Sequence, residues 1–150
     1  MSWFKRVKEG ILTQTQDKKP TPDGLWYKCV ECKEPTSTKE FELNLWVCPK
    51  CDYHSRIGSR EYFDLLFDNG KFKELDANLS SGDPLNFVDT KAYPLRIEQS
   101  KKKSGLTDAV RTATGKINNL RVSMAVMDFA FIGGSMGSVV GEKIARAIDV

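Results

Sequence analysis

The sequence predicts an α/β protein in two parts, a small four-cysteine ribbon followed by a larger domain that mixes helices and strands. Three observations lead to this prediction. Four cysteines form two closely spaced pairs in the first third of the chain, helical and strand-like patterns follow one another after Gly58, and a glycine-rich segment separates the last strand pattern from the last helix pattern. We therefore divide the 150 residues into an N-terminal segment and linker (1–24), the ribbon (25–57) and the larger domain (58–150).

The only cysteines of the chain are Cys29, Cys32, Cys48 and Cys51, in two Cys-x-x-Cys pairs. This spacing predicts one structural Zn²⁺ site, because each pair can direct two sulfurs at one point. Four thiolates complete a tetrahedral shell, so the metal keeps no position for substrate or catalytic water. The only histidine, His54, is therefore expected to lie on the ribbon surface and not to be a ligand.

Two disulfides, or one redox-active Cys-x-x-Cys pair, are the competing interpretation of the cysteines. Residues 1–10 contain no apolar run of secretory length, so we expect no signal peptide and a cytoplasmic location. In a reducing cytosol thiols bind metal more often than they pair. Apolar runs elsewhere are also far shorter than the roughly 20 residues that span a bilayer, which predicts a protein without membrane segments.

The ribbon and the segment before it carry few elements. Residues 1–8 can form a short amphipathic helix, and residues 13–24 are polar and broken by prolines, as in a linker. Residues 25–27 predict a strand, and alternating apolar and polar residues over 41–47 predict a second one, as in a hairpin. The ribbon aromatics are expected to form its own small core and not to stack on bases; they are Trp26, Tyr27, Phe41, Trp46 and Tyr53.

The larger domain opens with a predicted helix that has Ser59 as N-cap and stops at Asn69-Gly70. Residues 75–86 are polar and rich in turn formers. A second helix is predicted over 93–104, where Lys101, Lys102 and Lys103 suit the negative end of the helix dipole; a phosphate contact is the alternative role for these lysines.

Residues 109–117 and 120–131 predict a β-hairpin whose turn is Asn118-Asn119. The nearly continuous apolar run of the second strand predicts a strand covered on both faces. A glycine-rich segment, residues 133–137, leads into a predicted helix over 142–148. Strand, glycine loop and helix form an arrangement that can bind anions through backbone N–H groups, although the segment matches neither the Walker A loop nor the G-x-G-x-x-G dinucleotide motif.

The charge of the chain argues against a strong nucleic-acid surface. Residues 1–60 carry eleven Lys and Arg against eight Asp and Glu, whereas residues 61–150 carry twelve of each. Zinc bound by four thiolates adds a net charge of −2, so a metallated ribbon would be only weakly basic. The excess of Lys and Arg in the N-terminal part is thin support for a surface that binds phosphates. A zinc-ribbon nucleic-acid-binding protein is nevertheless the alternative functional class, because ribbons of this kind commonly contact RNA or DNA.

Two stretches of the sequence resemble a known family. The ribbon with Cys48-Pro-Lys-Cys51-Asp-Tyr-His54, and the block Asp-Phe-Ala-Phe-Ile-Gly-Gly-Ser-Met-Gly-Ser-Val-Val-Gly at 128–141, closely resemble the β subunit of the multi-subunit acetyl-CoA carboxylase carboxyltransferase. The resemblance extends over nearly the whole chain and implies a crotonase-like (ClpP/crotonase) α/β domain after the ribbon. It implies transfer of a carboxyl group from carboxybiotin to acetyl-CoA, which gives malonyl-CoA for fatty-acid biosynthesis, while ATP is used by a separate component.

The same resemblance implies partners and site residues. The partners are a carboxyltransferase α subunit in an α2β2 assembly, the biotin carboxyl carrier protein and biotin carboxylase, with RNA binding by the ribbon as a secondary role. Gly133, Gly134, Ser135 and Gly137 are expected either to line the acyl-CoA site or to form a tight turn between strand and helix. The catalytic residues are not identified and are expected beyond Val150, because the family continues for about as much sequence again; the 150 residues alone are expected to be inactive.

Overall fold

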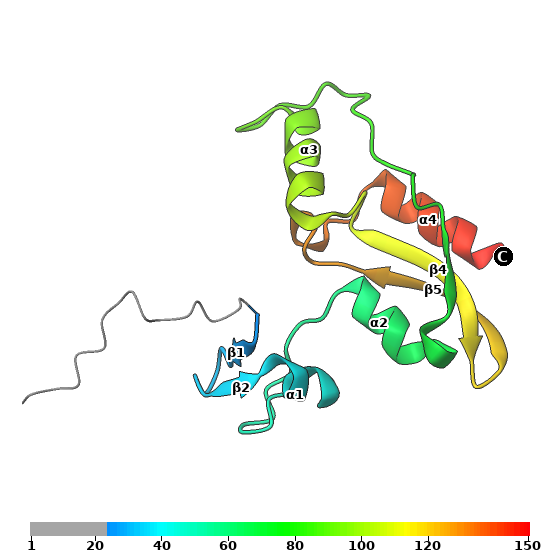
Figure 1. The fold of residues 1–150 in the computed structure, drawn as a ribbon. Coiled ribbons are helices and arrows are strands. Elements are labelled where there is room, and N and C mark those ends of the chain that lie inside the picture. The colour runs from blue at the N-terminus through cyan, green and yellow to red at the C-terminus, as the bar shows by residue number, and fades with distance from the viewer. Residues whose placement is uncertain (1–23) are drawn as a thin grey trace, which may run out of the picture. The chain divides into compact units, whose positions relative to one another are not determined.

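The computed structural model describes residues 24–150, which fall into two compact units divided between Ser55 and Arg56 (Figure 1). The helix predicted over 1–8 and the linker predicted over 13–24 lie outside the described residues, apart from Gly24. Within the described part of the chain, no helix has the length and apolar character needed to cross a membrane.

The first unit is built on a short antiparallel pair and one helix. Strands β1 (Trp26–Lys28) and β2 (Pro35–Ser37) pair with Tyr27 opposite Thr36. Helix α1 (Thr38–Leu43) follows at once, and the Ser37 hydroxyl caps it by accepting the Glu40 N–H at 3.2 Å. Serine with glutamate three residues later is a helix-start signal, which explains why the chain turns from strand to helix here.

The strand predicted over 41–47 is wrong, because helix α1 occupies the first part of this segment. The alternating pattern suggested two faces, but Phe41 is buried whereas Leu43 is 76% exposed. Leu45 and Trp46 then take positive φ angles of 55° and 58°, which ends any extended run. A single bridge between Val47 and His54 is all that the structure has of the predicted hairpin at this place.

The aromatic core of the ribbon is smaller than predicted. The rings of Tyr27 and Phe41 stack with centroids 3.9 Å apart, and the Tyr27 hydroxyl lies 2.8 Å from that of Ser55. Trp26 and Tyr53, in contrast, are exposed, Trp26 by 66%, so the prediction of a core role is wrong for these two residues.

The second unit contains a three-stranded antiparallel sheet of order β3-β4-β5. Its strands are β3 (Phe72–Leu75), β4 (Val110–Ile117) and β5 (Leu120–Met127). The predicted hairpin with its Asn118-Asn119 turn is confirmed, with φ of 52° and 66° at the two asparagines. Strand β3 was not predicted, because its four residues gain their partners only from β4, about 40 residues further along the chain.

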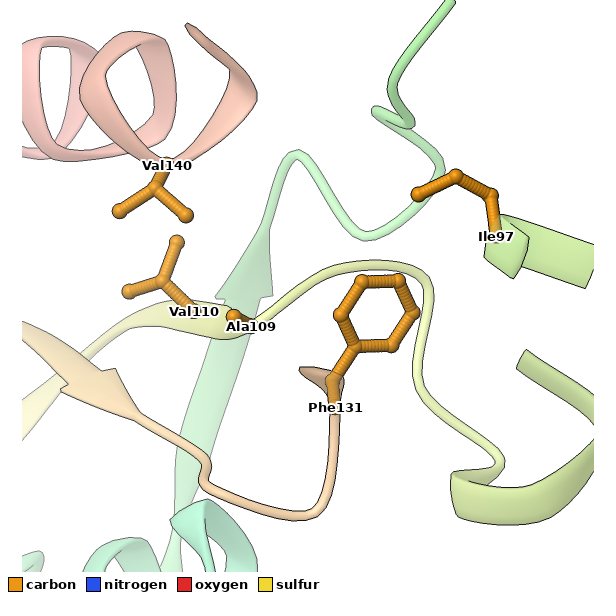
Figure 2. Packing of buried hydrophobic residues seen from close by; sticks show 5 residues of the cluster. All are labelled: Ile97, Ala109, Val110, Phe131 and Val140. Carbon is orange, nitrogen blue, oxygen red and sulfur yellow. The ribbon is translucent and has the colours of Figure 1, made fainter. Parts of the chain in front are cut away.

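Helices cover both faces of this sheet (Figure 1). They are α2 (Ser59–Leu66), α3 (Tyr93–Ser104) and α4 (Ser138–Ile148), and short 3-10 turns lie at Asp68–Gly70 and Ile132–Gly134. Phe63 and Phe67, from α2 and its C-terminal end, pack against Ala113 on one face. On the other face Val140 of α4 points toward Val110, and the Phe131 ring lies between Ala109 and Ile97 (Figure 2).

The second strand of the hairpin was predicted to be covered on both faces. In the structure, only the first strand, β4, is fully covered on both faces. Val110, Thr112 and Ala113 of β4 are completely buried, whereas no residue of β5 is. Strand β5 also ends at Met127 and does not continue to Phe131. The helix predicted over 142–148 begins earlier, at Ser138.

Asp128, the polar residue that interrupts the apolar run, is buried and binds the start of α2. Its Oδ2 accepts hydrogen bonds from the N–H and the hydroxyl of Ser59, at 2.8 and 2.9 Å. Its Oδ1 accepts from the Ala130 N–H at 3.0 Å. The N-cap position of α2 is Gly58 and not Ser59 as predicted, because this carboxylate from a distant segment caps the helix in place of a local side chain.

Replacing Asp128 by Ala is expected to lower the free energy of unfolding by about 1–3 kcal/mol, because the buried Ser59 donors lose their acceptor. The matched control is Asp64→Ala on the exposed face of α2, where an i,i+4 pair with Arg60 contributes at most about 0.5 kcal/mol. Urea denaturation of both variants measures the difference.

The same interaction predicts a pH dependence. Burial raises the pKa of Asp128, but the Ser59 and Ala130 N–H groups and the Ser59 hydroxyl outweigh it and lower that pKa below its usual value. A lowered native pKa stabilises the fold above the ordinary aspartate pKa of about 3.9, and this stabilisation is lost as the pH falls through the native pKa. The stability gap between wild type and Asp128→Asn should therefore shrink below about pH 4; an equal gap at pH 3 and pH 7 would contradict the assignment.

Candidate functional site

The four cysteines lie on two turns of the first unit that have the same local geometry. In the first turn the Lys33 N–H donates to the Cys29 carbonyl at 3.1 Å, and in the second the Asp52 N–H donates to the Cys48 carbonyl at 2.9 Å. Lys33 and Asp52 both take positive φ, 64° and 57°. The two Cys-x-x-Cys segments therefore fold alike, and each presents two sulfurs on the same side of its turn.

All four cysteines are free, and their Sγ atoms lie within 4.8 Å of one another. The Sγ atoms of Cys29 and Cys51 are 3.7 Å apart, and those of Cys32 and Cys48 are 3.8 Å apart. A tetrahedron of sulfurs around a metal at about 2.3 Å has edges of about 3.8 Å, so the cluster has the size that one such ion requires. The competing prediction of disulfides does not agree with these free thiols.

The electrostatics of the cluster also favour a bound cation. The Tyr53 N–H lowers the pKa of the Cys51 thiol, but desolvation and the three neighbouring sulfurs outweigh it and raise that pKa to about 12. Four thiolates this close repel one another, and a divalent cation removes the repulsion. His54 is exposed and does not belong to the cluster, which agrees with its predicted surface position.

The glycine-rich segment forms a tight turn between β5 and α4. Gly133 and Gly134 take φ of 64° and 78°, a region that side chains other than glycine rarely adopt. The Gly134 N–H donates to the Phe131 carbonyl at 2.9 Å, and the Ser135 N–H donates to that of Ile132 at 3.2 Å. These two N–H groups are thus used within the turn; the predicted substrate-binding role of the segment stays a prediction.

After the turn, the beginning of α4 lies beside two connected cavities. The larger, about 430 Å³, is mostly apolar and is lined by Ser81, Gly82, Asp83, Pro84, Leu85, Phe87, Tyr93 and Ser138. The smaller, about 170 Å³, shares three of these residues and also includes Ser135 and Gly137. Gly137 is the N-cap of α4 and brings no side chain to cap it, so the first N–H groups of this helix lack a capping side chain.

The structure therefore brings two of the four predicted substrate residues, Ser135 and Gly137, to a cavity wall, whereas Gly133 and Gly134 are not among the lining residues. The loop residues that form most of the wall were missed in the sequence. Their segment is polar and turn-rich, yet Leu85 is 83% exposed and Phe87 and Val88 are also exposed. Three apolar residues within an otherwise polar segment were the signal available in the sequence.

The charged groups near this unit's core have structural roles. Arg111 donates to Glu74 at 2.9 Å across the β3–β4 pair. Lys143 is 1% exposed, and its Nζ lies 3.3 Å from the Val110 carbonyl. Burial lowers the pKa of Lys143, while the nearby carboxylates, Asp108 first, act in the opposite direction. The first contact joins β3 to β4, and the second attaches α4 to β4.

Fold and site together define a two-part α/β protein, with a four-cysteine ribbon that can hold one metal ion and a second unit in which a glycine turn and a helix start lie beside an apolar cavity. No family model matches the sequence. Known relatives do: the chain is similar over 149 residues, 99% of its length, to proteins named acetyl-coenzyme A carboxylase carboxyl transferase subunit beta.

The relative from Pedobacter heparinus is 58% identical and that from Flavobacterium psychrophilum is also 58% identical, with 53% and 52% of their lengths covered. The relative from Amoebophilus asiaticus is 52% identical, with 53% covered. The chain is thus similar over nearly its whole length to these carboxyl transferase beta subunits. It spans about half the length of the curated relatives it matches.

Substitutions in the glycine turn before α4 test whether this turn depends on the positive φ of Gly134. Gly134→Ala is expected to lower the free energy of unfolding by about 1–3 kcal/mol, because φ is positive and the new Cβ would meet the Phe129 ring at 3.0 Å. Gly137→Ala is the matched control, since its φ is −104° and no atom of the described residues lies within 4 Å of the added Cβ. Thermal and urea unfolding measure both; equal losses would show that the turn does not depend on Gly134.

Proposed function

We propose that this chain is part of a carboxyltransferase β subunit, which transfers a carboxyl group from carboxybiotin on a carrier protein to acetyl-CoA and forms malonyl-CoA. The observation that supports this most is the 58% identity over 149 residues to proteins of that name. The proposal includes an α subunit in an α2β2 assembly, the biotin carboxyl carrier protein and biotin carboxylase as partners, the cytoplasm as location, and a crotonase-like arrangement of the second unit.

The chemistry of this reaction suggests a role for the cavities. Carboxylation at the methyl carbon of acetyl-CoA passes through an enolate, whose oxyanion needs backbone N–H donors held in place in advance. The N–H groups at the start of α4 that lack a capping side chain are donors of this kind, next to an apolar cavity of about 430 Å³ that suits the uncharged part of a thioester. The described residues thus contribute binding, and we assign the remaining donors to the other half of the subunit.

We further propose that Cys29, Cys32, Cys48 and Cys51 hold one structural Zn²⁺. The sulfur separations of 3.7 and 3.8 Å support this, and a closed shell of four thiolates gives the metal no part in the reaction. The alternative of a nucleic-acid-binding ribbon gains no support. Residues 24–60 carry six Lys and Arg against five Asp and Glu, and a zinc–thiolate centre would make this segment net negative.

Replacing Cys48 by Ser is expected to abolish zinc binding and to unfold the ribbon, because structural zinc contributes on the order of 10 kcal/mol to such modules. His54→Ala is the matched control, since this exposed side chain lies outside the cluster and should leave one zinc per chain. Metal content by mass spectrometry and limited proteolysis within residues 24–55 give the readout. One equivalent of zinc in purified Cys48→Ser protein would refute the ligand assignment.

The carboxyl transfer itself is tested on the full-length subunit assembled with its partner subunit, with acetyl-CoA as acceptor. Leu85→Asp places a charge in the apolar cavity and is expected to raise the KM for acetyl-CoA about tenfold or more, since burying one leucine contributes roughly 1.5–3 kcal/mol. Leu120→Asp, an exposed leucine beside the hairpin turn, is the control.

Malonyl-CoA formation by the wild type, with a raised KM in Leu85→Asp only, supports the proposal. Absence of transfer by the wild-type assembly contradicts the function. Transfer with equal KM values for both variants contradicts the assignment of the cavity.

A further inference from the structure

Besides the two cavities, a groove of about 360 Å³ runs along α3, and the side chains that line it are almost all hydrogen-bond donors. The lining residues are Thr90, Lys91, Arg96, Gln99, Ser100 and Lys103. Two ammonium groups, one guanidinium, two hydroxyls and one amide form this wall. No carboxylate is among them, which sets this groove apart from the other cavities of the second unit.

The charges around the groove leave an excess of positive charge inside it. Asp89 contacts two of the lining residues: it pairs with Arg96 and also accepts the Lys91 N–H at 3.0 Å. The Lys91 N–H, desolvation and Arg96 together lower the pKa of Asp89, so it is charged at neutral pH. With Asp89 counted, the groove still carries two net positive charges from Lys91, Arg96 and Lys103.

Within residues 24–150, no ion pair neutralises the positive charge of Lys91 or Lys103. Among the residues that the structure describes, neither Lys91 nor Lys103 forms a salt bridge, and the Lys91 ammonium only contacts the Gln99 amide oxygen at 3.2 Å. Lys102, by contrast, pairs with Glu98 on the flank of the helix at 2.6 Å. The negative end of the helix dipole opposes an anion near Lys103, but it is compensated by the lysines of the last turn.

Ammonium, guanidinium and hydroxyl donors in one concave wall are the chemistry that binds phosphate groups. The groove also adjoins the candidate substrate site, because Arg96 lines both this groove and the cavity that contains Ser135 and Gly137. From Arg96 to Lys103 the helix extends about 10 Å. A ligand with a thioester at one end and phosphates at the other can therefore lie across Arg96, with its two ends in the two sites.

We propose that the groove of Lys91, Arg96 and Lys103 binds the phosphate groups of the acyl-CoA substrate. This inference rests on the proposed function and assigns it a specificity site: the phosphates, and not the acyl group, are recognised along α3. It also gives Lys103 the phosphate-contacting role that the sequence left open for the three lysines of this helix end, and excludes Lys102 from it.

The test compares two acceptors in the full-length subunit assembled with its partner: acetyl-CoA, and S-acetyl-pantetheine, which has the same thioester but no phosphate. The double variant Lys91→Gln/Lys103→Gln is expected to raise the KM for acetyl-CoA by about tenfold or more, as for the loss of charge-assisted hydrogen bonds, and to leave the KM for S-acetyl-pantetheine unchanged. Lys116→Gln, an exposed lysine at the hairpin end of β4 that does not line the groove, is the matched control. Adenosine 3′,5′-bisphosphate should compete with acetyl-CoA in the wild type and more weakly in the double variant.

The outcomes separate the two proposals. Suppose that the wild type carboxylates acetyl-CoA. If the KM of the double variant then rises equally for both acceptors, or for neither, the assignment of the phosphate groove is wrong and the proposed function stands. If the wild-type assembly carboxylates neither acceptor, the function is wrong, and direct calorimetric binding of CoA decides the groove: equal affinity of wild type and double variant would overturn it. Unfolding temperatures within the range of the Lys116→Gln control exclude a general loss of structure.

Discussion

The carboxylate of Asp128 connects the parts of the second unit on which the candidate site depends. One oxygen holds the start of α2, from 69 residues earlier in the chain, and the other holds the Ala130 N–H and turns the chain out of β5. Because the chain turns there, Phe131 enters the core between Ala109 and Ile97 (Figure 2). The glycine turn follows directly after Phe131, whose position is fixed by the core, and α4 then begins beside the cavities. A buried carboxylate is tolerated at this place because three donors surround it.

Local signals in the sequence predicted those elements whose stability is decided locally. Helix α3 has the expected bounds, the hairpin has the expected Asn118-Asn119 turn, and the four cysteines do lie together, because capping, turn and ligand spacing are properties of short segments. The segment 41–47 failed for a related reason: its alternation imitated a strand, while the stronger local signal, Ser37 with Glu40, lay just before it. Strand β3, the capping partner of Asp128 and the cavity wall all depend on residues that are 30 or more positions apart, and no periodic pattern reports such contacts.

The two units use different means to fix their structures. The second unit has two clusters of buried apolar residues, one on each face of its sheet. In the first unit, described on its own, Phe41 and the two buried cysteines are the only buried apolar residues of the described part. Such a small core does not stabilise a module alone, which is the usual reason for a structural metal in small domains. The repeated turn around each cysteine pair has the geometry for this, since each one directs two sulfurs without using side chains of the core.

Under the proposed function, the position of α3 would separate the recognition of the substrate phosphates from the site of the chemistry. Its face toward the core carries Ile97, which packs against Phe131 and so supports the segment that leads to the glycine turn. Its exposed face carries the basic groove, and Arg96 lines both this groove and the cavity that contains Ser135 and Gly137. A substrate held through its phosphates on a rigid helix would place its thioester end at a fixed distance from the start of α4, so binding energy from the remote part of the ligand would contribute to the orientation of the reacting part. The same core contacts that support the turn would then also determine where the phosphates are held, which makes the packing of Ile97 against Phe131 part of the geometry of the site.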